Sequence, residues 1–169
     1  MGMFMKLGNI KTGDSTQEGF EGTKGWMNIS SFQWGDAVVR KIQTRTGKAR
    51  DREQSQPHIS NIKITKEVDH ASGPLYKSLV VVPEATECKI AFVRTGPGGE
   101  NDKYLEYTLT DTLLAGLEIT GTGDRAHEVW QLDFTELEIE VKQLEESNVA
   151  LGPYRYSYNL AKGKKGGGS

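Results

Sequence analysis

The chain has 169 residues, 36% apolar and 26% charged, with a net charge of −2 at neutral pH. This length suits one domain with one hydrophobic core, and the charge excludes a protein that is basic overall and binds nucleic acid through that excess. Because Cys88 is the single cysteine, an internal disulfide framework is excluded as well. No run approaches the ~20 apolar residues of a membrane helix, and the start lacks the apolar run of a signal peptide.

The first half of the chain contains short apolar segments that indicate β-strands. Two aromatic-rich segments, 3–10 and 26–42, come first. A further strand over about 58–69 is marked by Ile62 and Ile64, because apolar residues at alternate positions share one face of a strand.

One segment has helical spacing. The apolar residues pair at i and i+4, which predicts a short helix over 73–82 with Ser72 as its N-cap and Pro83 as its end. The pairs are Leu75 with Leu79 and Tyr76 with Val80.

The C-terminal half alternates between apolar and polar residues and predicts further strands. Alternation also predicts that Cys88 and the tyrosines of the last strand belong to the core. The expected strands lie around 88–92 before a turn at 96–99, over 105–109 and 113–119 with a tight connection at Asp111, and over 154–160 with Tyr154, Tyr156 and Tyr158 on one face.

The apolar phase changes between two consecutive segments. Apolar residues are even-numbered from Trp130 to Phe134 and odd-numbered from Leu137 to Val141. A single flat strand would turn its core face to water there, so we predict a bulge or corner near residues 135–136. The whole pattern predicts an all-β domain with one short helix, and the phase change favours a small β-barrel.

Catalytic and metal-binding patterns are missing. The histidines have no metal-ligand spacing, and one cysteine cannot build a zinc site. Asp69 next to His70 suggests an acid–base pair, but we expect Asp69 and Ser72 to start the helix instead. We therefore expect no enzyme activity, no metal and no cofactor. The histidines are His58, His70 and His127.

Two segments are polar throughout. Residues 44–57 contain no large apolar side chain, and a long segment of this kind in a small domain is commonly functional or disordered. Residues 162–169 are rich in glycine and lysine and are expected to form a flexible tail, so the domain is expected to span 1–161.

The order of several segments resembles the Hcp family, the tube protein of bacterial type VI secretion systems. The most specific element is 62–69, which reads Ile-Lys-Ile-Thr-Lys-Glu-Val-Asp, followed by Ala71, Ser72 and Leu75. The other segments that carry the resemblance are 3–10, 29–35, 98–101 before 104–105, 132–134 and 152–160.

The resemblance implies a small β-barrel that assembles into a homohexameric ring. Rings would stack into a hollow tube. A contractile sheath would surround this tube, a spike protein would sit at its tip, and effector cargo would travel in its lumen. It also implies synthesis in the bacterial cytoplasm and secretion to the extracellular space or a target cell without a signal peptide.

Two sets of residues receive roles from the resemblance. The first is a polar segment that would contact the neighbouring ring through charged groups. The second is Gln33, which would face the lumen because Phe32 and Trp34 occupy the opposite face of the same strand. The ring-stacking set is Arg45, Thr46, Gly47, Lys48, Arg50, Asp51, Arg52 and Glu53.

Alternatives remain open at the level of sequence. The chain also fits a tail-tube subunit of a phage or another contractile particle. A monomeric barrel that binds carbohydrate or peptide through exposed tyrosines is a second class. A hydrolase would need an acid–base pair that the sequence does not reveal.

Overall fold

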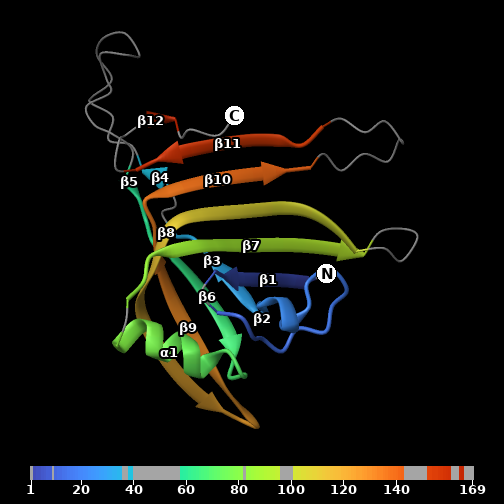
Figure 1. Ribbon diagram of the computed structural model, residues 1–169, viewed down its shortest axis with the longest axis vertical. Coiled ribbons are helices and arrows are strands. Elements are labelled where there is room, and N and C mark those ends of the chain that lie inside the picture. Colours follow the sequence, from blue (N-terminus) through green and yellow to red (C-terminus); the bar gives the residue numbers. More distant parts are fainter. Residues whose placement is uncertain are drawn as a thin grey trace.

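The computed structural model describes residues 2–8, 10–35, 38–39, 58–81, 83–95, 101–142, 152–160 and 164–165 (Figure 1). Within these residues the fold is built from antiparallel strands and one α-helix, which confirms the predicted mostly-strand class. The elements are β1 (Gly2–Leu7), the short 3-10 helix η1 (Gly22–Lys24), β2 (Trp26–Ile29), β3 (Ser31–Gln33), β4 (Val38–Val39), β5 (His58–Ile59), β6 (Ile62–Glu67), α1 (Ser72–Val80), β7 (Thr86–Thr95), β8 (Asn101–Thr122), β9 (Arg125–Asp133), β10 (Glu136–Val141), β11 (Tyr154–Asn159) and β12 (Lys164–Lys165).

Apart from β4 and β5, which pair with each other in a separate sheet, the described strands form a branched sheet rather than a closed barrel. One branch runs in the order β12-β11-β10-β8-β7-β1-β2, and the other runs from β8 through β9 and β6 to β3. Consecutive strands β2 and β3 therefore end different branches, and the Ser30 N–H donates to the Thr65 carbonyl oxygen where the branches meet. The expectation of a closed barrel is corrected, because the ladder stays open between β2 and β3.

Strand β8 belongs to both branches and replaces the predicted tight connection at Asp111. Its first half pairs with β10 and β7, and its second half pairs with β9. Asp111 takes a positive φ of 50°, which aspartate tolerates better than most residues. The chain therefore bends at Asp111 and continues as a strand, whereas a hairpin would pair the two halves with each other.

The predicted corner near residues 135–136 is confirmed. β9 ends at Asp133 and β10 begins at Glu136. The Thr135 N–H donates to the Thr110 carbonyl oxygen, and the Thr135 hydroxyl donates to the Asp111 carboxylate at 3.0 Å. The two bends thus lie side by side, and each holds the other in place as the sheet divides.

The core lies between the two branches, with α1 closing one end (Figure 1). Its centre includes Met5, Ile64, Leu75 and Trp130, all of them fully buried. A second, smaller cluster involves the connection between β1 and β2, where the ring of Phe20 stacks on that of Phe4 at 4.9 Å. The connection between β1 and β2 is therefore anchored on β1.

Helix α1 begins one residue earlier than predicted and ends at Val80. Ser72 lies inside the first turn and is not the N-cap, which is Ala71. Its hydroxyl oxygen accepts a hydrogen bond from the Asp69 N–H, and the Asp69 carboxylate accepts one from the Ala71 N–H. The expectation that Asp69 and Ser72 together start the helix is confirmed, because their side chains accept hydrogen bonds from two backbone N–H groups at its beginning.

Tyr154 and Tyr156 of β11 are not core residues, contrary to the prediction, whereas Tyr158 is half-buried. Tyr154 is 70% exposed and Tyr156 is 43% exposed. They pair with Val141 and Ile139 of β10, and β10 and β11 lie next to the end of the branch (Figure 1). The alternation is real, but this part of the sheet extends beyond the residues that cover its apolar face.

The predicted tail, 162–169, is described at Lys164 and Lys165. Their backbone pairs with β11 opposite Asn159 and Tyr158. The remaining tail residues and the predicted turn at 96–99 lie outside the described residues.

Candidate functional site

The first candidate surface is the exposed face of β3. Gln33 is exposed, while Phe32 and Trp34 point to the other side and pack against the core. The Phe32 ring stacks on Tyr107 at 5.4 Å and meets Phe92 edge-on at 5.2 Å. The predicted alternation about Gln33 is confirmed, since two partly buried aromatic rings fix the direction in which this amide points.

Gln33 is one member of a row of polar side chains that crosses three strands. It lies opposite Lys63 of β6, and Lys63 lies opposite Gln131 of β9. Residues that are paired across antiparallel strands have Cβ atoms about 4.5–5.5 Å apart on one face. The exposed face of this branch therefore offers two amides and one ammonium group in a line.

The two residues that follow Gln33 are held by two hydrogen bonds. The Trp34 indole N–H donates to the Ser60 carbonyl oxygen at 2.9 Å, and the Ser60 hydroxyl donates to the Gly35 carbonyl oxygen. These bonds tie the end of β3 to the segment between β5 and β6. The backbone around Gln33 is consequently fixed on both sides.

The ring-stacking residues cannot be compared with the structure. Arg45, Thr46, Gly47, Lys48, Arg50, Asp51, Arg52 and Glu53 lie outside the described residues.

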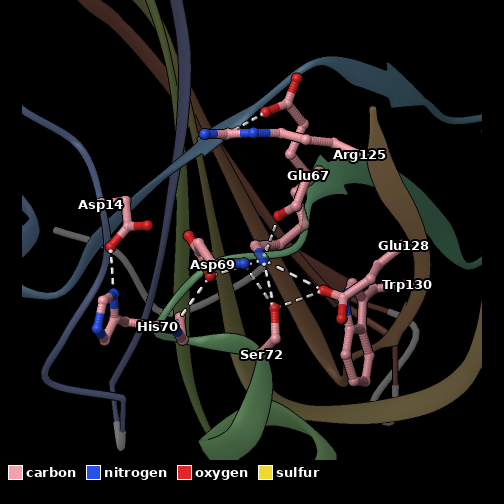
Figure 2. A network of polar contacts seen from close by, with 10 residues as sticks. Asp14, Glu67, Asp69, His70, Ser72, Arg125, Glu128 and Trp130 are labelled. Carbon is pink, nitrogen blue, oxygen red and sulfur yellow. Dashed lines mark hydrogen bonds and ion pairs between the residues drawn. The ribbon is translucent and has the colours of Figure 1, made fainter. Parts of the chain in front are cut away.

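A second candidate site is a buried polar network at the start of α1, shown in Figure 2. The Lys66 side chain is fully buried, and its ammonium group lies 2.7 Å from Asp69 Oδ1 and 3.2 Å from Glu128 Oε2. The carbonyl oxygen of Glu67 and the hydroxyl of Ser72 complete its surroundings, at 2.7 and 3.0 Å. Four acceptors thus surround the three N–H donors of an ammonium group.

The Glu128 carboxylate finds its hydrogen-bond donors in the same network. Its Oε2 atom accepts hydrogen bonds from the Ser72 hydroxyl at 2.9 Å and from the Trp130 indole N–H at 3.2 Å (Figure 2). The Glu128 and Asp69 side chains are 6% and 9% exposed. The network therefore joins β6, the turn after it, the first turn of α1 and β9 through groups that are almost all removed from water.

Sequence analysis missed Lys66 and Glu128, although a signal was present. Ile62 and Ile64 mark the buried face of β6, and the next position in that phase is Lys66. On β9, Glu128 likewise lies on the same buried face as Trp130 and Leu132, because the three residues occupy alternate positions. A lysine and a glutamate on the core faces of two strands indicate a buried ion pair when the strands are neighbours, but their pairing was unknown.

This network is unsuited to nucleophilic catalysis. A serine next to a lysine acts as a nucleophile when the amine is free to take up a proton. Here the Lys66 ammonium group lies 2.7 Å from Asp69 Oδ1 and 3.2 Å from Glu128 Oε2, so it is held by two carboxylates. The geometry therefore serves to fix α1 in position rather than to activate Ser72.

Cys88 is fully buried on β7, as the alternation predicts. Burial, reinforced by the Glu87 carboxylate, raises the pKa of its thiol far above the ordinary value. The thiol consequently stays protonated and packs as a small apolar side chain. Burial likewise raises the pKa of Tyr107.

The described part of the chain contains no cluster of three or more histidine, cysteine, aspartate or glutamate side chains arranged to hold a metal ion. Asp69 and His70, which are adjacent in the sequence, do not form an acid–base pair, since His70 Nδ1 instead lies 3.1 Å from Asp14 Oδ1. In the same residues, no helix is long and apolar enough to cross a membrane.

The comparison with protein families decides the family. A family model described as "Type VI secretion system effector, Hcp" matches residues 4–141. The chain belongs to the Hcp family. The segments that carried the resemblance from 3–10 to 132–134 fall largely within this match, so the prediction of the family and of its association with type VI secretion is confirmed.

Solved structures agree with this Hcp-family chain in fold. A structure described as a type six secretion system protein has a TM-score of 0.81 at 19% identity, over 98% of this chain and 99% of that one. Hcp1 from Salmonella typhimurium has a TM-score of 0.69 at 19% identity, over 98% and 99% of the two chains. A type VI secretion system effector from Yersinia pestis has a TM-score of 0.68 at 16% identity, over 93% and 98%.

No sequence among curated proteins shows significant similarity to the chain.

Proposed function

We propose that this Hcp-family chain is a structural subunit of the type VI secretion tube. Six copies form a ring, rings stack into a hollow tube, and a contracting sheath propels the tube behind a spike protein. The protein acts without catalysis and leaves the cell with the tube. The family match over residues 4–141 carries this proposal, and the mostly-strand fold shared with solved Hcp structures supports it.

Within the ring, Gln33 lines the lumen and contacts effector cargo. Its exposure between two inward-facing aromatic residues supports this role. The stacking contacts belong to the polar segment that includes Arg45–Glu53, in which four basic residues and two acidic residues stand close together. Charged contacts between rings would weaken as salt increases, because exposed charges are screened over about 8–10 Å at physiological ionic strength.

The first prediction concerns the oligomer. Light scattering and native mass spectrometry at tens of micromolar protein should give six times the subunit mass, and negative-stain images should show rings. A cyclic ring requires two different surfaces on each subunit that meet by rotation. A purely monomeric protein would contradict the proposal and favour a monomeric binding domain.

The second prediction concerns Gln33→Arg. The ring should form as before, because the core and the polar segment are unchanged, while lumen-dependent cargo should be reduced in pull-downs and in secreted fractions. In the hexamer, this change removes six amides that would contact cargo and crowds the lumen with six larger side chains. Gln33→Asn, which keeps the amide, serves as the matched control. Loss of the ring would assign Gln33 to a subunit interface, and unchanged cargo binding would contradict the lumen assignment.

A further inference from the structure

A cavity of about 530 Å³ lies beside Gln33 on the exposed side of β3 and β6. Gln33, Asn61 and Lys63 contribute amide and ammonium donors to its lining, and His58 contributes an imidazole ring. This volume falls within the range of pockets that hold small ligands or a few side chains of a peptide.

The described part of the lining has one sign of formal charge. Among the described residues that line the cavity, Lys63 carries a positive charge and none is an aspartate or a glutamate. Lys63 is exposed, and no ion pair joins it to another described residue. The exposed carboxylates of Glu118 and Asp133 belong to β8 and β9 and do not line the cavity.

The backbone that shapes the cavity is fixed independently of any ligand. Trp34 and Ser60 hold the ends of the two lining segments together through the hydrogen bonds described above. Gln33 and Lys63 are paired across β3 and β6, so their side chains leave the sheet side by side. A backbone that is already fixed does not have to be ordered when a ligand binds.

We propose that this cavity binds carboxylate groups of acidic polypeptide segments, with Lys63 as the residue that selects for negative charge. The inference rests on the proposed function, because it names the chemical class of cargo that Gln33 would contact. An ammonium group flanked by neutral amides favours a carboxylate through one charge-assisted hydrogen bond and neighbouring neutral ones. The chain as a whole is acidic, with net charge −2. The attraction of an acidic segment must therefore come from the charge of Lys63 at the cavity and not from the net charge of the protein.

The test uses fluorescence anisotropy of a short fluorescein-labelled Gly-Ser peptide with glutamates at alternate positions, at low ionic strength. A matched peptide carries glutamines at the same positions. We expect the glutamate peptide to bind more tightly, and Lys63→Gln to weaken its binding about tenfold while leaving the glutamine peptide unaffected. Binding of the glutamate peptide should also weaken as salt increases.

Lys24→Gln is the matched control, because Lys24 is an exposed lysine of η1 that does not line the cavity. It should leave the affinity for both peptides unchanged. Equal weakening by Lys24→Gln and Lys63→Gln would show attraction to surface charge in general and overturn the inference. Unchanged binding by Lys63→Gln would overturn it as well.

The native mass of each sample separates this inference from the proposed function. The cavity is lined within one copy of the chain, so monomers also report on it. Lys63-dependent binding by monomers that never form rings would contradict the tube proposal and support the inference. Rings without Lys63-dependent binding would overturn the inference alone. Loss of the ring in Lys63→Gln would show a contact between copies, which also overturns it.

Discussion

Lys66→Met should lower the free energy of unfolding by about 3–5 kcal/mol, the usual cost of breaking a buried ion pair. The substitution removes the cation and leaves Asp69 and Glu128 as buried carboxylates without a counter-charge. Small domains are stable by about 5–15 kcal/mol in total, so this loss is a large share. Urea unfolding at one fixed protein concentration measures it, since assembly also contributes to apparent stability.

Lys63→Met is the matched control on the same strand. Lys63 lies three positions before Lys66 on the exposed face of β6, so its replacement should change stability by no more than about 0.5 kcal/mol. A combined Lys66→Met, Asp69→Asn and Glu128→Gln variant removes every charge of the network and should recover part of the loss. Equal stability of the Lys66 and Lys63 variants would contradict the role given to the network.

Replacing residues 47–53 with a Gly-Ser linker of the same length should leave rings intact and abolish tubes and secretion. The replaced segment contains Lys48, Arg50, Asp51, Arg52 and Glu53, to which we assign the contacts between rings. Light scattering reports the ring, negative-stain images report tubes, and the secreted fraction reports export.

The control for this variant keeps the charges. Changing Arg50 and Arg52 to lysine and Asp51 to glutamate should preserve tubes at low salt, because it keeps each charge near its original place. Normal tubes from the Gly-Ser variant would contradict the assignment of the stacking contacts.

Alternation along the chain predicted what depends on local pattern. It placed Gln33 opposite Phe32 and Trp34, and it placed Cys88 in the core. It also located the corner between β9 and β10 from the change of phase alone. These features are encoded within a few consecutive residues, and so the sequence is sufficient to find them.

Features that depend on distant partners could not be predicted in this way. A turn residue at Asp111 suggested a hairpin, but the choice between a hairpin and a bent strand depends on which strands lie beside the two halves. Tyr154 and Tyr156 alternate as core residues do, yet exposure depends on how far the covering elements extend. The Lys66 network likewise becomes visible only when β6 and β9 are known to be neighbours.

The shared strand β8 also determines when the protein can fold during its synthesis. β1 at the start of the chain pairs with β7, and β6 pairs with β9. Neither branch can therefore form until strands much later in the sequence have been synthesised. Long-range pairings of this kind slow folding and leave strand edges open in the growing chain. The two branches cannot fold separately, because β8 supplies a pairing edge to each. The protein therefore completes its fold as one cooperative unit, after β8 and β9 have left the ribosome.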